Sequence, residues 1–530
     1  MSKKKAIITS SIITLIIGLI YFYFVLPPIN PQSFAFWIFV FVLAFVFMIA
    51  YSSFTTVVTL RTRTLPKLPL YVIGGIVGIS LLIIIVNFIL SPLFNAKSYA
   101  KRIVVNENAN FTEDVAPVNF NALPLLDKDS SQRLGDKVMG QMPELVSQFE
   151  VSSLYTQINF NDKIMRVTPL EYASIIKYFT NRNEGVKGYI TVNSVSGDTE
   201  LVKLEQGMKY MPSALFFENL QRKLRLQYPT AIFGKEEFEI DNEGNPYWIV
   251  PVMKYTGVGL KRDVESVIIL DPITGKSTKY KVVDVPTWVD HVYSADLLIE
   301  QVDDWGKYRG GFFNSIFGQK NVVKTTTGYN YTVMNDDVYL YTGVTSAAMD
   351  QSILGFILSN MRTKETKFYP APGAEESSAM ASAVGQVQQM NYKATFPLLI
   401  NLNNKPTYLI SLKDNAGLVK MYAFVDVEDY QKVVVTDVAE GIEVAAKNYL
   451  GGIEITNQDA ITKEIRIASI TSAMIDGTSY YYVTDQEGKQ YKASIKINTD
   501  LFPFLHVNDT VTITYNKESA VTEITKIEKK

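Results

Sequence analysis

The chain has 530 residues, no cysteine and a formal net charge of −2 at pH 7. The absence of cysteine excludes disulfides, thiolate nucleophiles and cysteine-ligated zinc or iron–sulfur sites. A near-neutral chain offers no basic field of the kind that holds nucleic acid by its phosphates, so we expect no nucleic-acid partner. A chain of this length predicts two or more domains in addition to any membrane segment.

Three long apolar runs fill the amino-terminal part, at residues 6–26, 34–60 and 70–94, and none contains a charged residue. A helix rises about 1.5 Å per residue, so each run is long enough to cross a hydrocarbon core of roughly 30 Å. The first run follows three lysines, as in a signal peptide, but no small-residue cleavage pattern comes after it. Residues 1–94 therefore predict a three-helix transmembrane anchor in a lipid bilayer.

The positions of the cations predict the orientation of this anchor. Lysines occupy positions 3–5, and Arg61, Arg63 and Lys67 lie between the second and third runs, whereas the connection between the first and second runs carries no cation. Cationic connections remain in the cytoplasm. We therefore expect a multi-pass protein of the cell membrane with a cytoplasmic amino terminus and with residues 95–530 outside the cytoplasm.

The third run contains a pair of glycines one helical turn apart. Gly74 and Gly78 form a G-x-x-x-G pattern, which lets two helix backbones approach closely. We expect this pair to pack against the other two spans of the chain, with dimerisation as the alternative.

Two stretches beyond the anchor share one pattern, a helix followed by three strands. The first has a predicted helix at 213–227 and strands at 230–240, 247–254 and 265–270; the second has a helix at 379–389 and strands at 394–401, 406–413 and 419–427. The sequence thus predicts an α+β ectodomain with two helix-plus-antiparallel-sheet repeats, at 212–283 and 379–450. A juxtamembrane α+β region is expected at 95–211, and an irregular polar and aromatic region at 284–378.

The end of the first repeat carries a resemblance. The segment ILDPITGKSTKY has an aspartate, Asp271, followed by a Thr-Gly-Lys turn at Thr274, Gly275 and Lys276. A helix with an antiparallel meander ending in this way resembles the PepSY-type modules of exported bacterial proteins. The second repeat has Val-Glu-Asp-Tyr where that turn would be. Three spans before such modules are similar to uncharacterised membrane proteins of Gram-positive bacteria, which implies a binding or regulatory role in the envelope.

The carboxyl-terminal segment, residues 460–530, is predicted to form a separate domain. It contains five strand candidates, with a short segment at 501–505 between the third and the fourth. This arrangement resembles a small OB-like β-barrel. Such barrels bind oligonucleotides, sugars or proteins, so the fold alone does not identify the ligand.

The stretch 284–382 concentrates glycine, aromatic and charged residues, which suits ordered loops that carry function. Two interpretations of this stretch remain open. It forms either a structural polar network or a ligand groove with tryptophans that stack on sugar rings. We expect Arg362 to pair with Asp336 or Asp337. The candidate groove residues are Trp288, Trp305, Asp336, Asp337, Arg362, Glu365 and Glu375.

No motif predicts catalysis, a cofactor or a metal ion. The Gly275-Lys276-Ser277 tripeptide resembles the end of a phosphate-binding loop, but Leu270 stands where that loop needs a glycine. Only two histidines are present and no G-x-S-x-G stretch supplies a nucleophile. We expect His291 to be a hydrogen-bonded structural residue. Adjacent acidic pairs on a strand point to opposite faces, so each offers at most one carboxylate to a site.

These observations favour a non-enzymatic binding or scaffolding protein of the bacterial cell envelope. It would be anchored by three spans, would meet a protein or cell-wall partner outside the membrane, and could regulate an envelope enzyme. Two alternatives remain open. One is an accessory subunit of a membrane transport or assembly complex, and the other is a carboxylate-dependent envelope hydrolase.

Overall fold

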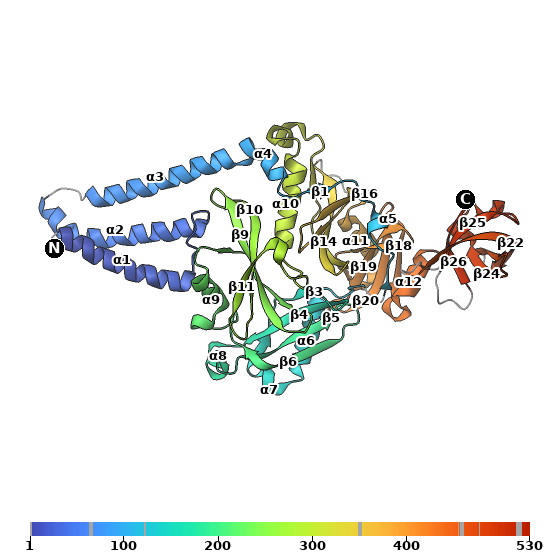
Figure 1. Cartoon of the computed structure of the whole chain (residues 1–530), viewed down its shortest axis with the longest axis horizontal. Coiled ribbons are helices and arrows are strands. Elements are labelled where there is room, and N and C mark those ends of the chain that lie inside the picture. The colour runs from blue at the N-terminus through green and yellow to red at the C-terminus, as the bar shows by residue number, and fades with distance from the viewer. Residues whose placement is uncertain are drawn as a thin grey trace.

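The computed structural model describes residues 3–62, 67–120, 123–347, 352–453, 455, 460–475, 478–515 and 522–529. Its amino-terminal part forms three apolar helices, α1 (Lys3–Val25), α2 (Phe34–Thr62) and α3 (Lys67–Leu90), each long enough to span a membrane. The prediction of three apolar helices followed by a large sheet-rich α+β region is confirmed (Figure 1). Arg63, one of the cations that predicted the orientation, lies outside the described residues.

The sheet-rich region that follows residue 94 sits on one end of the three helices. Asn87, near the end of α3, donates a hydrogen bond to the carbonyl of Val258 and accepts one from its amide, both at 2.9 Å. The amide of Ile29, between α1 and α2, donates to the carbonyl of Pro229 at 2.8 Å. The start of α1 lies at the opposite end of the helices (Figure 1).

The glycine pair of α3 does not pack as expected. A Cβ atom built on Gly74 or Gly78 would meet no atom within 4 Å among the described residues, whereas one on Gly18 of α1 would lie 2.9 Å from Leu43 of α2. Close approach therefore joins α1 to α2, and α3 is held by its end, through Asn87. The expected packing of this pair against the other spans is absent from the described chain.

The sheet-rich region contains four sheets of the same connectivity within the described residues. In each sheet the edge strand is broken into two short pieces, both of which pair with the first strand of a three-stranded meander. We number these units 1 to 4 along the chain. Unit 1 consists of α6 (Lys128–Gly140), β2 (Phe149–Val151), β3 (Thr156–Phe160), β4 (Lys163–Tyr172), β5 (Val186–Asn193) and β6 (Thr199–Met208); unit 2 consists of α9 (Leu220–Gln227), β7 (Ile232–Phe233), β8 (Glu237–Ile240), β9 (Pro246–Thr256), β10 (Leu260–Leu270) and β11 (Ser277–Lys281).

Units 3 and 4 have the same order of elements as units 1 and 2. In addition, β1 (Val105–Asn106) pairs as a parallel strand at the edge of the unit 3 sheet. Unit 3 consists of α10 (Ala295–Tyr308), β12 (Val323–Thr325), β13 (Asn330–Met334), β14 (Asp337–Ser346), β15 (Ser352–Asn360) and β16 (Thr366–Ala374); unit 4 consists of α11 (Glu376–Gly385), β17 (Lys393–Ala394), β18 (Leu398–Leu402), β19 (Lys405–Lys413), β20 (Val419–Asp426) and β21 (Val433–Asp437).

Units 2 and 4 fall on the two predicted repeats, while units 1 and 3 fall where no repeat was expected. The expected irregular character of residues 284–378 is wrong, because α10 and strands β12 to β16 occupy it. Its polar residues form tight turns between strands. Asn335 and Asp336 have φ angles of 50° and 68°, the backbone of a type I′ hairpin turn. The composition that resembled an irregular loop belongs partly to such turns and partly to α10, which carries Glu300, Asp303 and Asp304.

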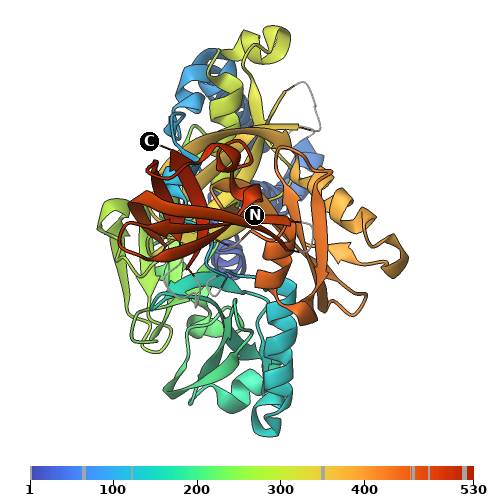
Figure 2. The same ribbon diagram turned by 90° about the vertical axis from the view of Figure 1, so that its right-hand side faces the viewer.

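Neighbouring sheets share hydrophobic cores. Trp248 of β9 packs with unit 1, and the next residue, Ile249, packs with α10 and the sheet of unit 3. Side chains of a strand alternate between faces, so this sheet is buried on both sides. Phe356 and Tyr408 lie in the core between units 3 and 4. Seen along the long axis, the four units surround a common centre (Figure 2).

The chain ends in a closed five-stranded barrel that has its own core. A helix, α12 (Ile442–Tyr449), packs on unit 4 and precedes it. The barrel forms the end of the molecule opposite to the membrane helices (Figure 1). Its strands, in the order in which they pair, are β22 (Ile461–Ile475), β23 (Thr478–Asp485), β24 (Gln490–Ser494), β26 (Thr522–Lys529) and β25 (Thr510–Tyr515).

Candidate binding cavity

A polar cavity of about 430 Å³ lies where the four units meet. Each unit contributes the residues at the break in its edge strand. These are residues 155–157 of unit 1, 235 and 237 of unit 2, 329–331 of unit 3, and 395, 396 and 398 of unit 4. In every unit the break lies between the two short strands of the edge. Because the four units surround a common centre, all four breaks line the same cavity.

The cavity holds a buried arginine without a partner. Arg166 lies on β4 directly opposite Gln157 of β3, and it is 6% exposed. Within the described chain its guanidinium donates no hydrogen bond and lies in no ion pair. Burial lowers its pKa to about 10, so the side chain stays charged at neutral pH. A buried cation with no acceptor is costly, and such a group needs an explanation.

Both carboxylates that line the cavity, Glu237 and Asp127, are already paired. Glu237 lies 2.9 Å from Lys235 and accepts a hydrogen bond from Thr156 at 3.1 Å. Asp127 contacts Lys413 and also accepts a hydrogen bond from the amide of Ser130 in the first turn of α6. Among the described residues, Arg166 is therefore the one buried cation of the cavity lining whose charge no carboxylate within salt-bridge distance offsets; Lys128 also lines the cavity without an ion pair, but it is exposed.

The side chain of Gln157 adds further unused hydrogen-bonding capacity. It is 2% exposed, and neither its amide nitrogen nor its oxygen has a hydrogen-bond partner in the described structure. A glutamine amide offers two donors and two acceptor positions. Together with Arg166 it gives the cavity donors suited to a carboxylate or phosphate oxygen.

A buried acidic cluster fixes the wall behind Gln157. Glu239 accepts hydrogen bonds from the backbone amides of Asp290 and His291, at 2.8 and 2.9 Å. Burial raises the pKa of Glu239 to about 8, and burial together with the charge of Glu239 raises the pKa of Asp290. Burial also lowers the pKa of His291, so the neutral ring donates through Nε2 to the carbonyl of Gln157 at 2.6 Å. His291 is thus a hydrogen-bonded structural residue, as expected.

Three of the sequence-predicted groove residues meet at the turn between β13 and β14. Asp337 is paired with Arg362 through two hydrogen bonds, at 2.7 and 2.8 Å, and it accepts another from Asn360. Asp336 is exposed and accepts a hydrogen bond from Asn159. These residues form a satisfied polar network and do not line the cavity.

The four remaining groove residues lie apart from this turn. Trp305 is buried in the core beneath α10 with the guanidinium of Arg309 4.8 Å from its ring, and Trp288 packs against Tyr247. Glu365 is exposed beside a lysine, and Glu375 precedes α11. The structure does not gather the seven residues into one groove.

Sequence reasoning missed Arg166 and Gln157. A signal was present, because Arg166 is the single charged residue in the run IMRVTPL at 164–170. A lone cation in an otherwise uncharged strand indicates either an edge or a buried polar site. The sequence does not indicate that residues of three other units would line the same cavity as Arg166.

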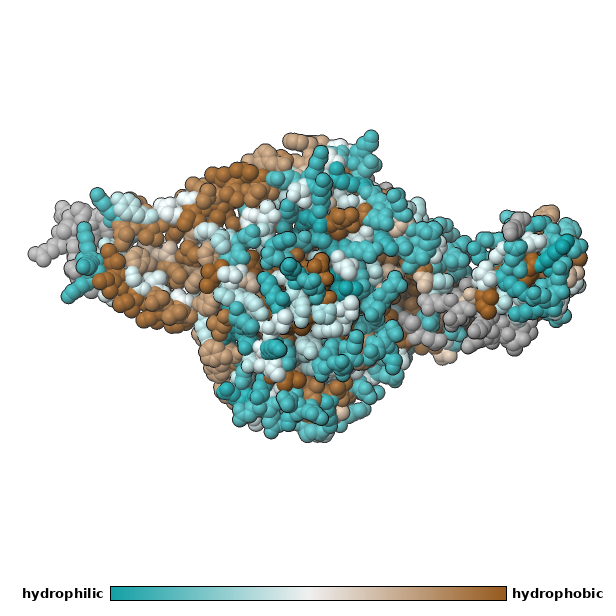
Figure 3. Space-filling view, in the orientation of Figure 1, coloured by the Kyte–Doolittle hydropathy of each residue, from teal (hydrophilic) through white to brown (hydrophobic). Residues whose placement is uncertain are grey.

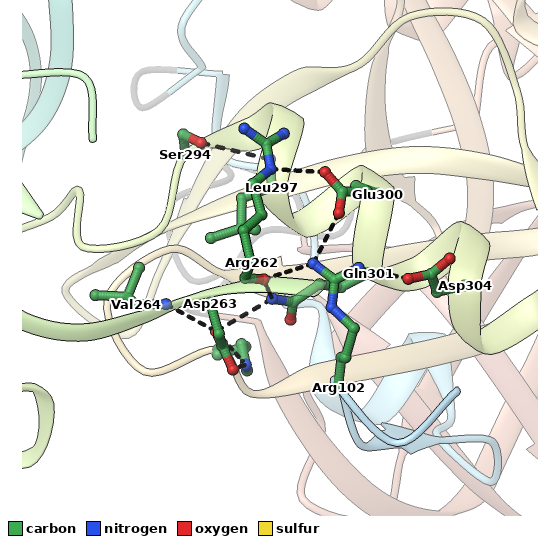
Figure 4. Close-up of polar contacts among 10 residues, drawn as sticks. Arg102, Arg262, Asp263, Val264, Ser294, Leu297, Glu300, Gln301 and Asp304 are labelled. Carbon is green, nitrogen blue, oxygen red and sulfur yellow. Dashed lines mark hydrogen bonds and ion pairs between the residues drawn. The ribbon is translucent and has the colours of Figure 1, made fainter. Parts of the chain in front are cut away.

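A second buried arginine, Arg102, shows a different environment. It follows α4 (Pro92–Ala100), the continuation of the third span, and its side chain is 3% exposed. It lies 2.8 Å from a carboxylate oxygen of Glu300, contacts the carboxylate of Asp304, and donates to the carbonyl of Arg262 (Figure 4). Glu300 and Asp304 lie one turn apart on α10. This cluster fastens the third span to unit 3.

The described residues contain no group of three histidine, aspartate or glutamate side chains placed to hold a metal ion. No protein-family model matches the chain, and no curated protein matches it significantly. The groups that the cavity offers are the guanidinium of Arg166, the side-chain amide of Gln157 and a polar wall.

Proposed function

We propose that this chain is a membrane-anchored, extracytoplasmic binding protein of a bacterial cell envelope, and that the cavity between the four units binds an anionic group through Arg166. The observation that carries the proposal is the convergence of four strand breaks on one cavity whose buried arginine has no partner. A carboxylate or phosphate would restore the pairing that Arg166 lacks. The described residues favour neither the accessory-subunit nor the hydrolase alternative, which stay predictions.

The size and charge of the cavity support a small ligand or the end of a larger one. Its volume of about 430 Å³ falls in the range of roughly 300 to 1,000 Å³ that is typical of ligand sites. A guanidinium holds a carboxylate or phosphate with two parallel hydrogen bonds. Such a ligand could be a small acid, or a peptide or wall fragment that ends in a carboxylate.

The orientation of the anchor is part of the proposal. Lys3 at the start of α1 and Lys67 at the start of α3 lie at the ends of the spans away from the ectodomain. Cations at that end support a cytoplasmic amino terminus and an ectodomain on the outer face of the membrane.

Two finer fold assignments belong to the proposal as well. The helix-plus-meander plan of the units supports the PepSY-like assignment, now extended to four units. For the barrel, β22 pairs with both β23 and β25, and β24 runs parallel to β26. This pairing, with the short helical turn at Phe502–Phe504 before β25, supports an OB-like barrel.

Thermal unfolding of the detergent-solubilised full chain tests the binding proposal. Sodium acetate, N-acetyl-D-alanyl-D-alanine and inorganic phosphate would be titrated against matched sodium chloride. We expect at least one anion to raise the unfolding temperature saturably, because a ligand of the folded state stabilises it by mass action.

Two variants give the control. The response should vanish in Arg166→Met and persist in Lys279→Gln, which alters an exposed cation on β11. An equal response in Arg166→Met would overturn the assignment of the site, and no saturable response to any of the three anions would overturn the proposal.

A further inference from the structure

Five exposed apolar side chains cluster on two segments of units 1 and 2. Ile175, Ile176 and Phe179 belong to α8 (Ile175–Asn181), and Phe216 and Phe217 belong to a 3₁₀ turn (Phe216–Glu218). Their exposed fractions range from 44% to 73%, and the rings of Phe179 and Phe216 lie 6.0 Å apart. We name these five residues the isoleucine–phenylalanine patch. A contiguous apolar surface of this kind indicates an interaction site.

The patch is held rigidly outward. Tyr178, next to Phe179, is 1% exposed, and its hydroxyl donates to the carboxylate of Glu218 at 2.7 Å, which ties α8 to the 3₁₀ turn. Phe216 has a φ angle of 50°, a left-handed conformation that bulky residues rarely adopt. The surrounding contacts therefore maintain an unfavourable backbone that leaves two phenylalanines exposed.

The patch continues from the first membrane span. The ring of Phe217 lies 6.4 Å from that of Tyr23, two residues before α1 ends. Arg222 also contacts Tyr23. Its guanidinium lies 4.1 Å from the Tyr23 ring, and its Nε donates a hydrogen bond to the Tyr23 carbonyl at 3.2 Å. Hydrophobic colouring passes from the spans onto the adjoining edge of the ectodomain in Figure 3, near the place of α8 in Figure 1.

We propose that the isoleucine–phenylalanine patch inserts into the lipid interface, as a second membrane contact of the ectodomain beside the three spans. The occupant is a phospholipid surface, because the patch lies where α1 leaves the hydrocarbon. Lys177 of α8 and Arg182, the residue that follows α8, flank the apolar side chains in sequence, and on this proposal they lie at the level of the headgroups. Apolar and aromatic side chains bordered by cations are typical of segments that lie in the interface.

Site-specific labelling tests this contact, because the chain has no cysteine. Ile176→Cys and Phe217→Cys would be labelled with a nitrobenzoxadiazole fluorophore in the full-length protein. The matched control is Phe504→Cys, an exposed phenylalanine of the barrel, at 68% exposure. Each labelled protein would be placed singly in phosphatidylcholine nanodiscs, with and without lipids that carry a nitroxide near the headgroup.

We expect the nitroxide lipids to quench the labels at 176 and 217 several-fold more strongly than the label at 504. Quenching at 176 and 217 no stronger than at 504 would overturn the proposal. If Phe217→Cys does not fold, as judged by its thermal unfolding, the label at Ile176 decides alone.

A second copy of the chain is the competing occupant. If the patch were a dimer contact, the labels at 176 and 217 would be shielded in detergent by self-association and would remain unquenched in nanodiscs that hold one copy. That result would also overturn the lipid assignment.

Discussion

Two buried arginines, Arg102 and Arg166, have almost the same exposure and opposite surroundings. Arg102 meets two carboxylates of α10 and a backbone carbonyl, while Arg166 meets no acceptor in the described residues. A third, Arg225, has no carboxylate, but it donates to four backbone carbonyls, those of Leu26, Tyr228, Pro229 and Ala231. What distinguishes Arg166 is therefore the lack of any acceptor.

The presence or absence of an acceptor distinguishes an arginine that stabilises the fold from one that is available to bind a ligand. Both Arg102 and Arg225 find acceptors in the folded chain, and both fasten the sheet-rich region near the ends of apolar helices. Folding leaves Arg166 unsatisfied at the centre of the ring, at a cost that a purely structural residue would avoid. The substitutions below test this contrast by the sign and the size of their effects.

The largest effect is expected at Arg102. Replacing Arg102 with glutamine leaves the largely buried Asp304 without its cation, while Glu300 keeps Arg262 at 2.6 Å, and breaking a buried ion pair in this way costs about 3 to 5 kcal/mol. Denaturant unfolding of the solubilised full chain, followed by tryptophan fluorescence, measures the loss. A loss no larger than that of an exposed ion pair would show that Arg102 is not a structural anchor.

Substitution of Arg166 should raise the free energy of unfolding, whereas substitution of Arg102 should lower it. Replacing Arg166 with methionine removes an unsatisfied buried charge, so the ligand-free protein should gain about 1 to 3 kcal/mol of stability. The same denaturation experiment, without added anions, measures the gain. Destabilisation by this substitution would show that Arg166 has a partner in the folded protein and would contradict the contrast with Arg102.

The acidic wall behind the cavity predicts a pH dependence. Glu239 has an ordinary pKa of 4.5 and a folded pKa of about 8. Between these values the folded chain binds a proton that the unfolded chain has released, so stability falls as the pH rises through this window. The slope from one such group is at most about 1.4 kcal/mol per pH unit. The raised pKa of Asp290 acts in the same direction.

Replacing Glu239 with glutamine should flatten this slope, whatever it does to stability at one pH. Unfolding free energies measured from pH 5 to pH 8 give the slope directly, and Glu265→Gln, on an exposed pair, should retain it. An unchanged slope in the Glu239 variant would show that Glu239 is ionised in the folded protein.

The smallest effect is expected at an exposed pair. Lys279 and Glu265 lie 4.0 Å apart with side chains 43% and 56% exposed. Pairs of this kind contribute little, because water screens them. Lys279→Gln should leave the denaturation midpoint unchanged within error, and a clear shift would mean that exposure does not explain the differences among these ion pairs.

Parts of the fold follow from local patterns. The apolar runs at 6–26, 34–60 and 70–94 predicted the three helices, and the alternation around 247–254 and 406–413 predicted strands β9 and β19. Unit 3 escaped prediction because its strands are joined by polar turns such as Asn335-Asp336, whose composition is that of a loop. The pairing of Arg362 with Asp337 was among the expected contacts, but it is structural.

The candidate cavity could not be predicted in the same way. Gln157 contacts His291 across 134 positions of sequence, and residues 329–331 and 395–398 join them from two further units. Hydrophobic periodicity shows which face of a strand is buried, but it does not show which sheets share a core.

The sequence by itself determined the membrane anchor, because the cost of placing polar groups in hydrocarbon acts on each segment separately. It also determined strands of units 2 and 4 and of the barrel, through the alternation of their side chains. Only the tertiary structure decided that Arg102 and Arg225 would find acceptors and that Arg166 would not. Whether a buried charge is satisfied depends on neighbours that are distant in the chain, and those neighbours are set by the packing of four sheets around one centre.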